Sequence, residues 1–319
     1  MNGILNVYKE KGYTSHDVVA KLRGICHQKK TGHTGTLDPD AEGVLPVCLG
    51  TATRLCEMLT DKDKEYEATL LLGIETDTQD SGGTVLKESE VLCGEEQVRE
   101  AVLSFTGTYM QIPPMYSALK VNGRKLCDLA REGITLERKP RPVTIHKITV
   151  EWVRLPRVRI RVHCSRGTYI RTLCHDIGGK LSCGGCMEEL LRTRAGMFTL
   201  SEAHTLSAIR QFVEEGRLSE ILIPPDRLFT GYPSARVTET YTKLLENGNR
   251  LPKRAFVITG QAAECAGCES GTPASGKYAM ADHLRVYHGE TFFGIYGRDE
   301  IRGDYKPVKI FWQRNQDGL

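Results

Sequence analysis

The sequence has no apolar run that approaches the roughly 18 residues needed to span a membrane. Its first nine residues, MNGILNVYK, lack the pattern of a signal peptide, so a cytoplasmic location is expected. The eleven cysteines are an odd number in a chain without an export signal, which predicts reduced thiols rather than a disulfide framework. No internal repeats are present. With 40% hydrophobic and 26% charged residues, the composition is that of a soluble globular protein.

The length of 319 residues is too great for one average domain and predicts two, each with its own core. The pattern of residue types changes near residue 230, after which short apolar runs alternate with Gly-containing turns. We therefore expect a larger domain over residues 1–230 and a small, mainly β domain over residues 231–319.

The formal net charge is only +3, but the charge is unevenly distributed. Residues 116–171 hold 14 Lys or Arg and four acidic residues, a balance of +10, whereas the remainder has a balance of −7. A solvated charged face and a polyanion-binding surface both fit such a segment. The concentration of positive charge favours a nucleic-acid partner, because phosphate neutralisation supplies most sequence-independent affinity.

Hydrophobic spacing and turn residues predict the main elements. They place strands at 3–8 and 66–72, a helix after a capping box at 14–17, a polar loop at 73–83 and an amphipathic helix at 95–105. The basic stretch at about 116–147 is predicted to be an insertion, partly helical and partly loop, and long loops of this kind are often functional.

Three arginines at positions 157, 159 and 161 alternate with apolar residues. A strand with this period buries the apolar side chains on one face and aligns the arginines on the other. After the turn that ends this strand, apolar residues recur at helical spacing, which predicts a helix with Tyr169 and Arg171 at its start, in the first helical turn. There Arg171 is either a solvated helix end or a bidentate partner for a carboxylate from another loop.

The segment GHTGTLDPDAEG at residues 32–43 sets Asp38 immediately before a proline in a loop with three glycines. The proline disfavours helical geometry for the preceding residue, so Asp38 should be held extended. The glycines remove side chains where another backbone or a substrate approaches closely. By local chemistry alone, the segment is either an ordinary turn or a loop that presents one acid to a ligand.

These residues resemble the catalytic motif of the TruB family, the bacterial tRNA pseudouridine-55 synthases, whose pattern G-H-x-G-x-L-D-P-x-A-x-G is met at every fixed position. Four further motifs fall in the family's order and approximate spacing: DKEY at 63–66, TDTQD at 76–80, PPMYSALK at 113–120 and CSRGTYIR at 164–171. The resemblance is strong over residues 2 to about 200 and loose beyond. It implies the α+β pseudouridine synthase fold, a mixed, mainly antiparallel sheet with flanking helices and a basic insertion, followed by a mainly β, PUA-like RNA-binding domain.

The resemblance also implies an activity, the isomerisation of the T-loop uridine 55 of tRNA to pseudouridine after the base leaves its stack. Asp38 would be the essential carboxylate, acting at C1′, C6 or C2′, and Arg171 would pair with it and keep it ionised. Tyr66 would lie against the uracil and is a candidate for removing the C5 proton, although a phenol needs help to act as a base. The implied substrate contacts are made by His33, which fills the space of the flipped base, and by Tyr169, Leu190, Lys9 and Lys120. No cofactor or metal is expected, nor an obligate protein partner, and the chain is expected to be a monomer.

Two other functions remain open from the sequence. One is a guide-RNA-dependent synthase of the dyskerin type, whose chains usually carry basic extensions that this one lacks. The other is a non-enzymatic RNA-binding protein, from which a missing Asp38, Tyr66 or Arg171 would be expected, yet all three are present. The pairs Cys183–Cys186 and Cys265–Cys268 also raise the alternative of a zinc site, but their separation is much longer than in common zinc ribbons, which favours free thiols.

Overall fold

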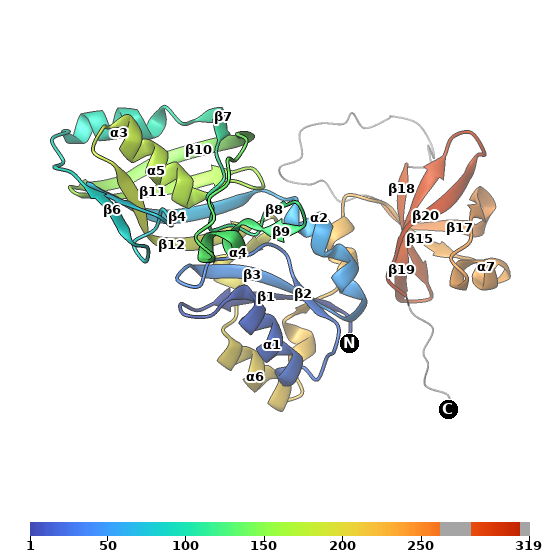
Figure 1. Cartoon of the computed structure of the whole chain (residues 1–319). Coiled ribbons are helices and arrows are strands. Elements are labelled where there is room, and N and C mark those ends of the chain that lie inside the picture. The colour runs from blue at the N-terminus through green and yellow to red at the C-terminus, as the bar shows by residue number, and fades with distance from the viewer. Residues whose placement is uncertain (262–281, 313–319) are drawn as a thin grey trace.

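The computed structural model, which describes residues 1–261 and 282–312, contains a ten-stranded and a six-stranded sheet (Figure 1). The path through the larger sheet is β14 (Leu222–Ile223), β1 (Gly3–Lys9), β3 (Glu42–Leu49), β12 (Gly185–Ala195), β4 (Lys64–Leu72), β11 (Arg157–Cys164), β10 (Arg141–Arg154) and β7 (Gly107–Gln111). Two short strands, β2 (Thr31–His33) and β13 (Phe198–Thr199), pair with β3 and β12. All pairings are antiparallel except that of β3 with β12, so the predicted mixed, mainly antiparallel sheet is confirmed.

The predicted strands follow from their alternation. In β11 the apolar residues Val158, Ile160 and Val162 are fully buried, while the three arginines between them lie on the other face. The predicted strands at 3–8 and 66–72 are found as β1 and β4, each extended by one or two residues. Strand formation here follows from burial of one face.

Two pairs of helices cover the two halves of the larger sheet. α1 (Ser15–Ile25) begins at the predicted capping box, in which the Asp17 backbone N–H donates to the Thr14 hydroxyl at 3.0 Å. It packs with α6 (Leu206–Glu214) over β1 and β3. α3 (Glu95–Leu103) and α5 (Ile170–Lys180) bury their apolar faces against β4, β10 and β11.

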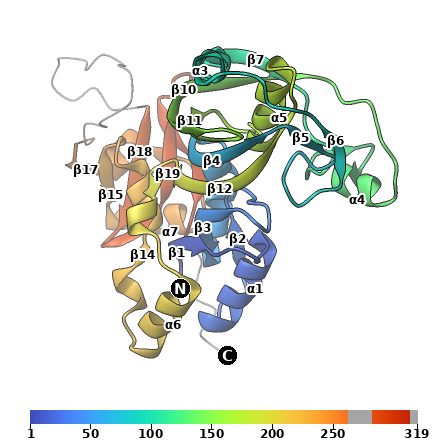
Figure 2. The same cartoon turned by 90° about the vertical axis from the view of Figure 1, so that its left-hand side faces the viewer.

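The predicted loop at 73–83 contains β5 (Ile74–Thr76), which pairs with β6 (Val85–Glu88) in a small hairpin that the turn residues did not reveal. The insertion is partly helical, as expected. It contains the hairpin of β8 (Lys120–Val121) with β9 (Arg124–Lys125), then α4 (Leu126–Arg131), around a small core of its own. It is shorter than the predicted range of about 116–147, because Arg141 already begins β10. Figure 2 shows α4 projecting clear of the larger sheet.

The six-stranded sheet is formed by β16 (Leu251–Pro252), β20 (Asp304–Ile310), β19 (Thr291–Asp299), β18 (His283–His288), β15 (Ser234–Val237) and β17 (Phe256–Gly260), with α7 (Thr242–Glu246) beside it. It is mainly antiparallel and has its own core. Phe229, Ile295 and Phe311 join a second core with β1, β3 and α2 (Cys56–Thr60). The likeness of this C-terminal part to a PUA domain stays a prediction. Within the described ranges no helix is both long and apolar enough to cross a membrane.

Candidate active site

A cavity of about 880 Å³ opens between the larger sheet and the insertion. It is lined by the glycine loop, by β4 and β12, by the residues at the start of α5 and by the insertion. Five of the predicted site residues line it: Asp38, Tyr66, Tyr169, Arg171 and Leu190. These predicted residues, up to 152 positions apart in the sequence, therefore share one pocket.

Asp38 and Arg171 form a bidentate ion pair at this cavity. Arg171 Nε lies 3.0 Å from Asp38 Oδ2, and Nη2 donates to Oδ1 at 3.3 Å. Asp38 lies in the loop between β2 and β3, where the Ala41 N–H donates to its carbonyl at 3.1 Å and closes a turn. Of the two alternatives for Arg171, the partner of a carboxylate is the correct one, and the pairing fixes both oxygens of Asp38.

Arg171 also ties together the segments around the pocket. Its side chain is only 6% exposed, and its Nη1 donates to the Thr78 carbonyl at 3.0 Å while Nη2 donates to the Tyr116 carbonyl at 2.8 Å. Asp80 supplies a second carboxylate 3.4 Å from Nη1. A buried guanidinium needs such partners, and these link the glycine loop, the loop after β5 and the insertion.

Burial raises the pKa of Asp38 above its usual value. The positive charges of Arg171 and Lys9 act in the opposite direction, and the negative charge of Asp80 adds to the increase in this pKa. The Asp38 side chain nevertheless keeps 37% of its exposure because it faces the open cavity. Arg171 therefore favours the ionised form as expected, but the enclosed position of the carboxylate outweighs it.

Tyr66 lies in β4 beside a buried arginine that sequence reasoning did not assign. Burial raises the pKa of Tyr66, and the hydrogen-bonded guanidinium of Arg192 opposes that increase. Arg192 in β12 is 1% exposed, and its Nε and Nη2 donate to the Val44 and Gly35 carbonyls at 2.6 and 3.2 Å. It is therefore placed to hold the glycine loop and to stabilise a Tyr66 phenolate. The signal was available, since an arginine in an apolar strand needs a buried partner.

Lys9 supports the glycine loop from behind rather than lining the cavity. Its ammonium group is fully buried at the end of β1 and donates to the carbonyls of Pro39, at 3.0 Å, and of Ala41. Burial lowers the pKa of Lys9 to about 8. The structure thus assigns Lys9 to the residues that follow Asp38, where it fixes the backbone.

His33 is half-buried and does not line the cavity itself. Its ring meets that of His16, which does line the cavity, edge-on with centroids 5.3 Å apart. Burial, with the nearby His16 and Arg192, lowers the pKa of His33 to about 4, so the ring is neutral near pH 7. A neutral ring suits the predicted stacking role better than acid–base chemistry.

Tyr169 is the N-cap of α5, one residue before the predicted first turn. Its backbone is held by Gln111 at the end of β7, whose side chain accepts from the Tyr169 N–H at 2.8 Å and donates to its carbonyl at 3.0 Å. Gln111 was not singled out from the sequence. Because Gln111 fixes the start of α5, it also fixes the backbone position from which the Arg171 side chain extends, two residues after Tyr169.

Lys120 does not line the cavity; it lies exposed on the β8–β9 hairpin. Its cross-strand partner Lys125 does line the cavity, as does Arg141 at the start of β10. The cations that border the cavity here are therefore Lys125 of the insertion and Arg141 directly after it.

The three arginines of β11 do not add to the predicted basic surface as free charges. Arg157 is paired with Glu188 at 2.7 Å, Arg159 with Glu67 at 3.1 Å, and Arg161 with Glu67 and Glu151 at 2.7 and 2.8 Å. Most of these acids lie outside residues 116–171, so a count along the sequence overstates the positive charge that this segment presents. The effective basic surface is the part that borders the cavity.

The cysteines of the first CxxC pair have different neighbours. Cys183 lies beside Cys93, whereas Cys186 lies near Cys174. The second pair, Cys265–Cys268, lies outside the described residues. None of the nine cysteines of the described ranges forms a disulfide, as predicted.

Comparison with known proteins identifies the family. Residues 23–170 match the N-terminal domain of the TruB family pseudouridylate synthases, and residues 171–230 match the tRNA pseudouridylate synthase B C-terminal domain. The tRNA pseudouridine synthase B of Lachnoclostridium phytofermentans is 52% identical over 98% of this chain and 100% of its own length. That of Clostridium kluyveri is 44% identical over 98% and 100%, respectively.

Two solved structures share the fold. An H/ACA RNP bound to a substrate RNA containing 2′-deoxyuridine superposes with a TM-score of 0.67 and 24% identity, covering 98% of this chain and 86% of the other. A Cbf5–Nop10–Gar1 complex superposes with a TM-score of 0.68 and 25% identity, with the same coverage. The pseudouridine synthase fold is thus confirmed, and the sequence matches make the chain a member of the TruB family of pseudouridylate synthases, which are isomerases.

Proposed function

We propose that this protein converts uridine 55 in the T-loop of tRNA to pseudouridine, with Asp38 as the essential catalytic carboxylate. The observation that carries the proposal is the bidentate pairing of Asp38 with the buried Arg171 in a pocket that also holds Tyr66 and Leu190. Relatives of 44% and 52% identity over 98% of this chain, each named tRNA pseudouridine synthase B, support tRNA as the substrate.

The reaction is an isomerisation within one nucleotide and needs no cofactor. The N1–C1′ bond breaks, the uracil rotates, and C5 bonds to C1′; the C5 proton leaves and N1 gains one. The target base must first leave the T-loop stack, at a cost of a few kcal/mol, which the phosphate contacts of the basic insertion help to offset. Asp38 faces the cavity with both oxygens held by Arg171, so it is pre-positioned for the flipped nucleotide.

Tyr66 is proposed to act on the C5 proton with the help of Arg192. Burial alone would keep the phenol protonated, and the Arg192 guanidinium is the group that stabilises the phenolate. His33 is proposed to occupy the place of the flipped base in the T-loop. Its ring is neutral near pH 7 and packs edge-on against His16, which lines the cavity.

Tritium release tests the proposal. The purified chain alone is incubated with an unmodified tRNA transcript whose uridines carry tritium at C5, and with a matched transcript that has cytidine at position 55. Release from the first transcript only is the expected result. Release that requires an added guide RNA would favour the dyskerin-type alternative, and tRNA binding without release would favour the non-enzymatic one. Activity at the concentration where the chain sediments as a single copy tests the proposed monomer.

The acid limb of the pH–rate profile should lie above the usual carboxyl pKa of about 3.9, because burial raises the pKa of Asp38 and the reaction needs its ionised form. Asp80→Asn removes a negative charge that adds to this increase. The limb should therefore move to lower pH in that variant, even though the maximal rate falls with the loss of an Arg171 partner. Profiles of kcat/KM between about pH 4 and 8, with Glu95→Gln on α3 as the control, check the direction; an upward shift would contradict it.

The salt dependence of tRNA binding should depend on the cations that border the cavity. Lys125→Gln and Arg141→Gln should each reduce the slope of log K against log salt by about 1, since each removes one phosphate contact. Arg157→Gln should leave the slope unchanged, because Glu188 already neutralises Arg157. Fluorescence anisotropy across a salt series measures all three. Equal slopes for all variants would show that Lys125 and Arg141 do not contact the RNA phosphates.

A further inference from the structure

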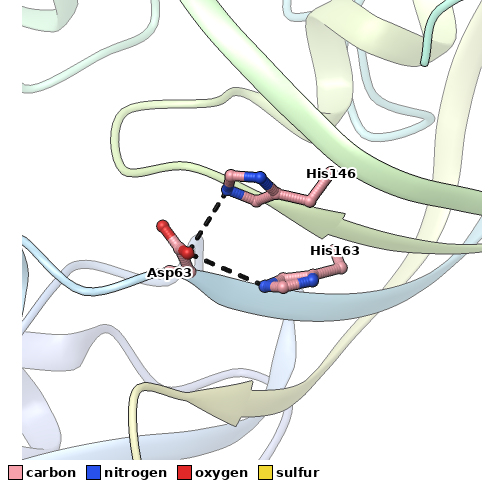
Figure 3. A group of neighbouring side chains, drawn as sticks. All are labelled: Asp63, His146 and His163. Carbon is pink, nitrogen blue, oxygen red and sulfur yellow. Dashed lines mark ion pairs between the residues drawn. The ribbon is translucent and has the colours of Figure 1, made fainter. Parts of the chain in front are cut away.

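A second cluster of chemically competent side chains lies outside the pocket, where β4, β10 and β11 adjoin. His146 Nε2 lies 3.3 Å from Asp63 Oδ2, and His163 Nε2 lies 3.8 Å from the same oxygen. All three ligand atoms fall within 4.8 Å of one another. Figure 3 shows both rings directing a nitrogen at the carboxylate from two neighbouring strands. Among the described residues, this is where His, Cys and acidic side chains meet at the spacing of metal ligands.

A β-bulge brings His146 into this cluster. Ile145 and Ile148 both point into the core, although they are three residues apart and would lie on opposite faces of a regular strand. The register shift between Ile145 and Lys147 resolves this, because Lys147 pairs with His163 and His146 is the extra residue. Bulges re-aim side chains and occur next to functional sites. Here the bulge leaves His146 on the outer face with His163.

We propose that Asp63, His146 and His163 bind a divalent transition-metal ion of the zinc class. Ligand atoms of a tetrahedral zinc ion with bonds near 2.1 Å lie about 3.4 Å apart, close to the two separations measured from Asp63. Two imidazoles and one carboxylate select Zn²⁺ and its neighbours over Mg²⁺ or Ca²⁺, which prefer oxygen ligands. The side chains are 30–44% exposed, which leaves a path for the ion and room for water as the fourth ligand.

The charges around the cluster are compatible with a bound cation. Arg194 Nη2 lies 3.1 Å from His163 Nε2, so it competes for that nitrogen. Arg194 is already paired with Glu65 at 2.6 Å and donates a hydrogen bond to the Gly196 carbonyl. It therefore keeps these partners when a metal replaces it at His163 Nε2.

A metal here would cross-link the start of β4 to β10 and β11. Asp63 directly precedes β4, which carries Tyr66 three residues further on, so the ion would stiffen these strands beside the proposed active site. It would take no part in the reaction, because none of the three ligands lines the cavity. The ion should bind the folded chain alone and therefore raise Tm by mass action.

The test uses the full chain after EDTA treatment and dialysis, titrated with ZnCl2. We expect the native chain to bind one more equivalent of zinc than His146→Gln, His163→Gln or Asp63→Asn. Its Tm should rise by about 5 °C at zinc concentrations about 100-fold above Kd, whereas the variants should show no such rise. His288→Gln in the C-terminal sheet is the matched control and should behave as the native chain.

Cobalt spectroscopy of the native chain gives a readout that requires no variant. Imidazole and carboxylate ligands predict visible d–d bands without a thiolate charge-transfer band, and the double variant Cys265→Ser, Cys268→Ser should keep these bands. Equal zinc stoichiometry in all variants, or loss of the d–d bands in the cysteine variant, would overturn the proposal.

Discussion

Replacing Asp38 by asparagine should lower the rate of tritium release from C5-labelled tRNA by about 10⁴-fold or more. The amide has the shape of the carboxylate but no charge, so it can act neither as a nucleophile nor as a base. Its oxygen still accepts from Arg171, which holds Thr78 and Tyr116 through other hydrogen bonds, so the pocket should keep its form. Affinity for tRNA should stay within a few-fold, because the proposed phosphate contacts are made by Lys125 and Arg141 and not by Asp38. Single-turnover tritium release and anisotropy measure the two quantities separately.

Asp40→Asn is the matched control for this variant. Asp40 lies two residues away in the same loop and is exposed, and it occupies a variable position of the family pattern. Its replacement should change the rate by less than about threefold. If Asp38→Asn retained more than about a tenth of the native rate, or if both variants were equally impaired, the assignment of the chemistry to Asp38 would be wrong.

Gly43→Ala should destabilise the fold by about 3–5 kcal/mol and lower Tm by about 10 °C. Gly43 has a φ of +103°, and an added Cβ would lie 2.3 Å from the Arg192 carbonyl oxygen and 2.9 Å from the Arg192 nitrogen. These are backbone atoms and cannot rotate away. The contact lies at the pairing of β3 with β12, which rests on only two residue pairs, Leu191 with Glu42 and Arg192 with Gly43. The same shift would displace Arg192 and the glycine loop, so activity should fall as well.

Gly12→Ala separates the clash from the backbone strain. Gly12 has a φ of +87° but nothing within 4 Å of an added Cβ, so its replacement should cost only the strain of about 1–2 kcal/mol. Urea unfolding followed by circular dichroism gives both values. A Gly43→Ala variant no less stable than Gly12→Ala would refute the role assigned to the close approach of β3 and β12.

Much of the site could be predicted because its signals are local. The glycine loop, the capping box of α1 and the alternation in β11 each follow from residues within a few positions of one another. The ordered motifs around Asp38, Tyr66 and Arg171 resembled a family in which these residues act together, and the structure lines one cavity with all three. The predicted roles of His33, Lys9 and Lys120 as substrate contacts are still to be tested.

Other features could not be predicted, because they depend on partners far along the chain. A count of charges along the sequence treats the arginines of β11 as unpaired, whereas the fold places Glu67 and Glu188 beside them. Gln111 and Arg192 acquire their roles only when β7 reaches the start of α5 and β12 reaches β3. Asp63, His146 and His163 are separated by up to 100 residues and meet because of one bulge.

The sequence by itself therefore determined turns, caps and strand alternation, since short-range patterns encode them, and its ordered motifs carried the resemblance that implied the family, the α+β class and the proposed reacting residues. Only the tertiary structure decided the electrostatics. Burial and nearby charges determine whether the pKa of a carboxyl group is raised, whether an arginine is free to bind phosphate and whether a histidine has a partner for a shared ligand. Sheet pairing across the whole chain sets that burial and brings those charges within a few ångströms.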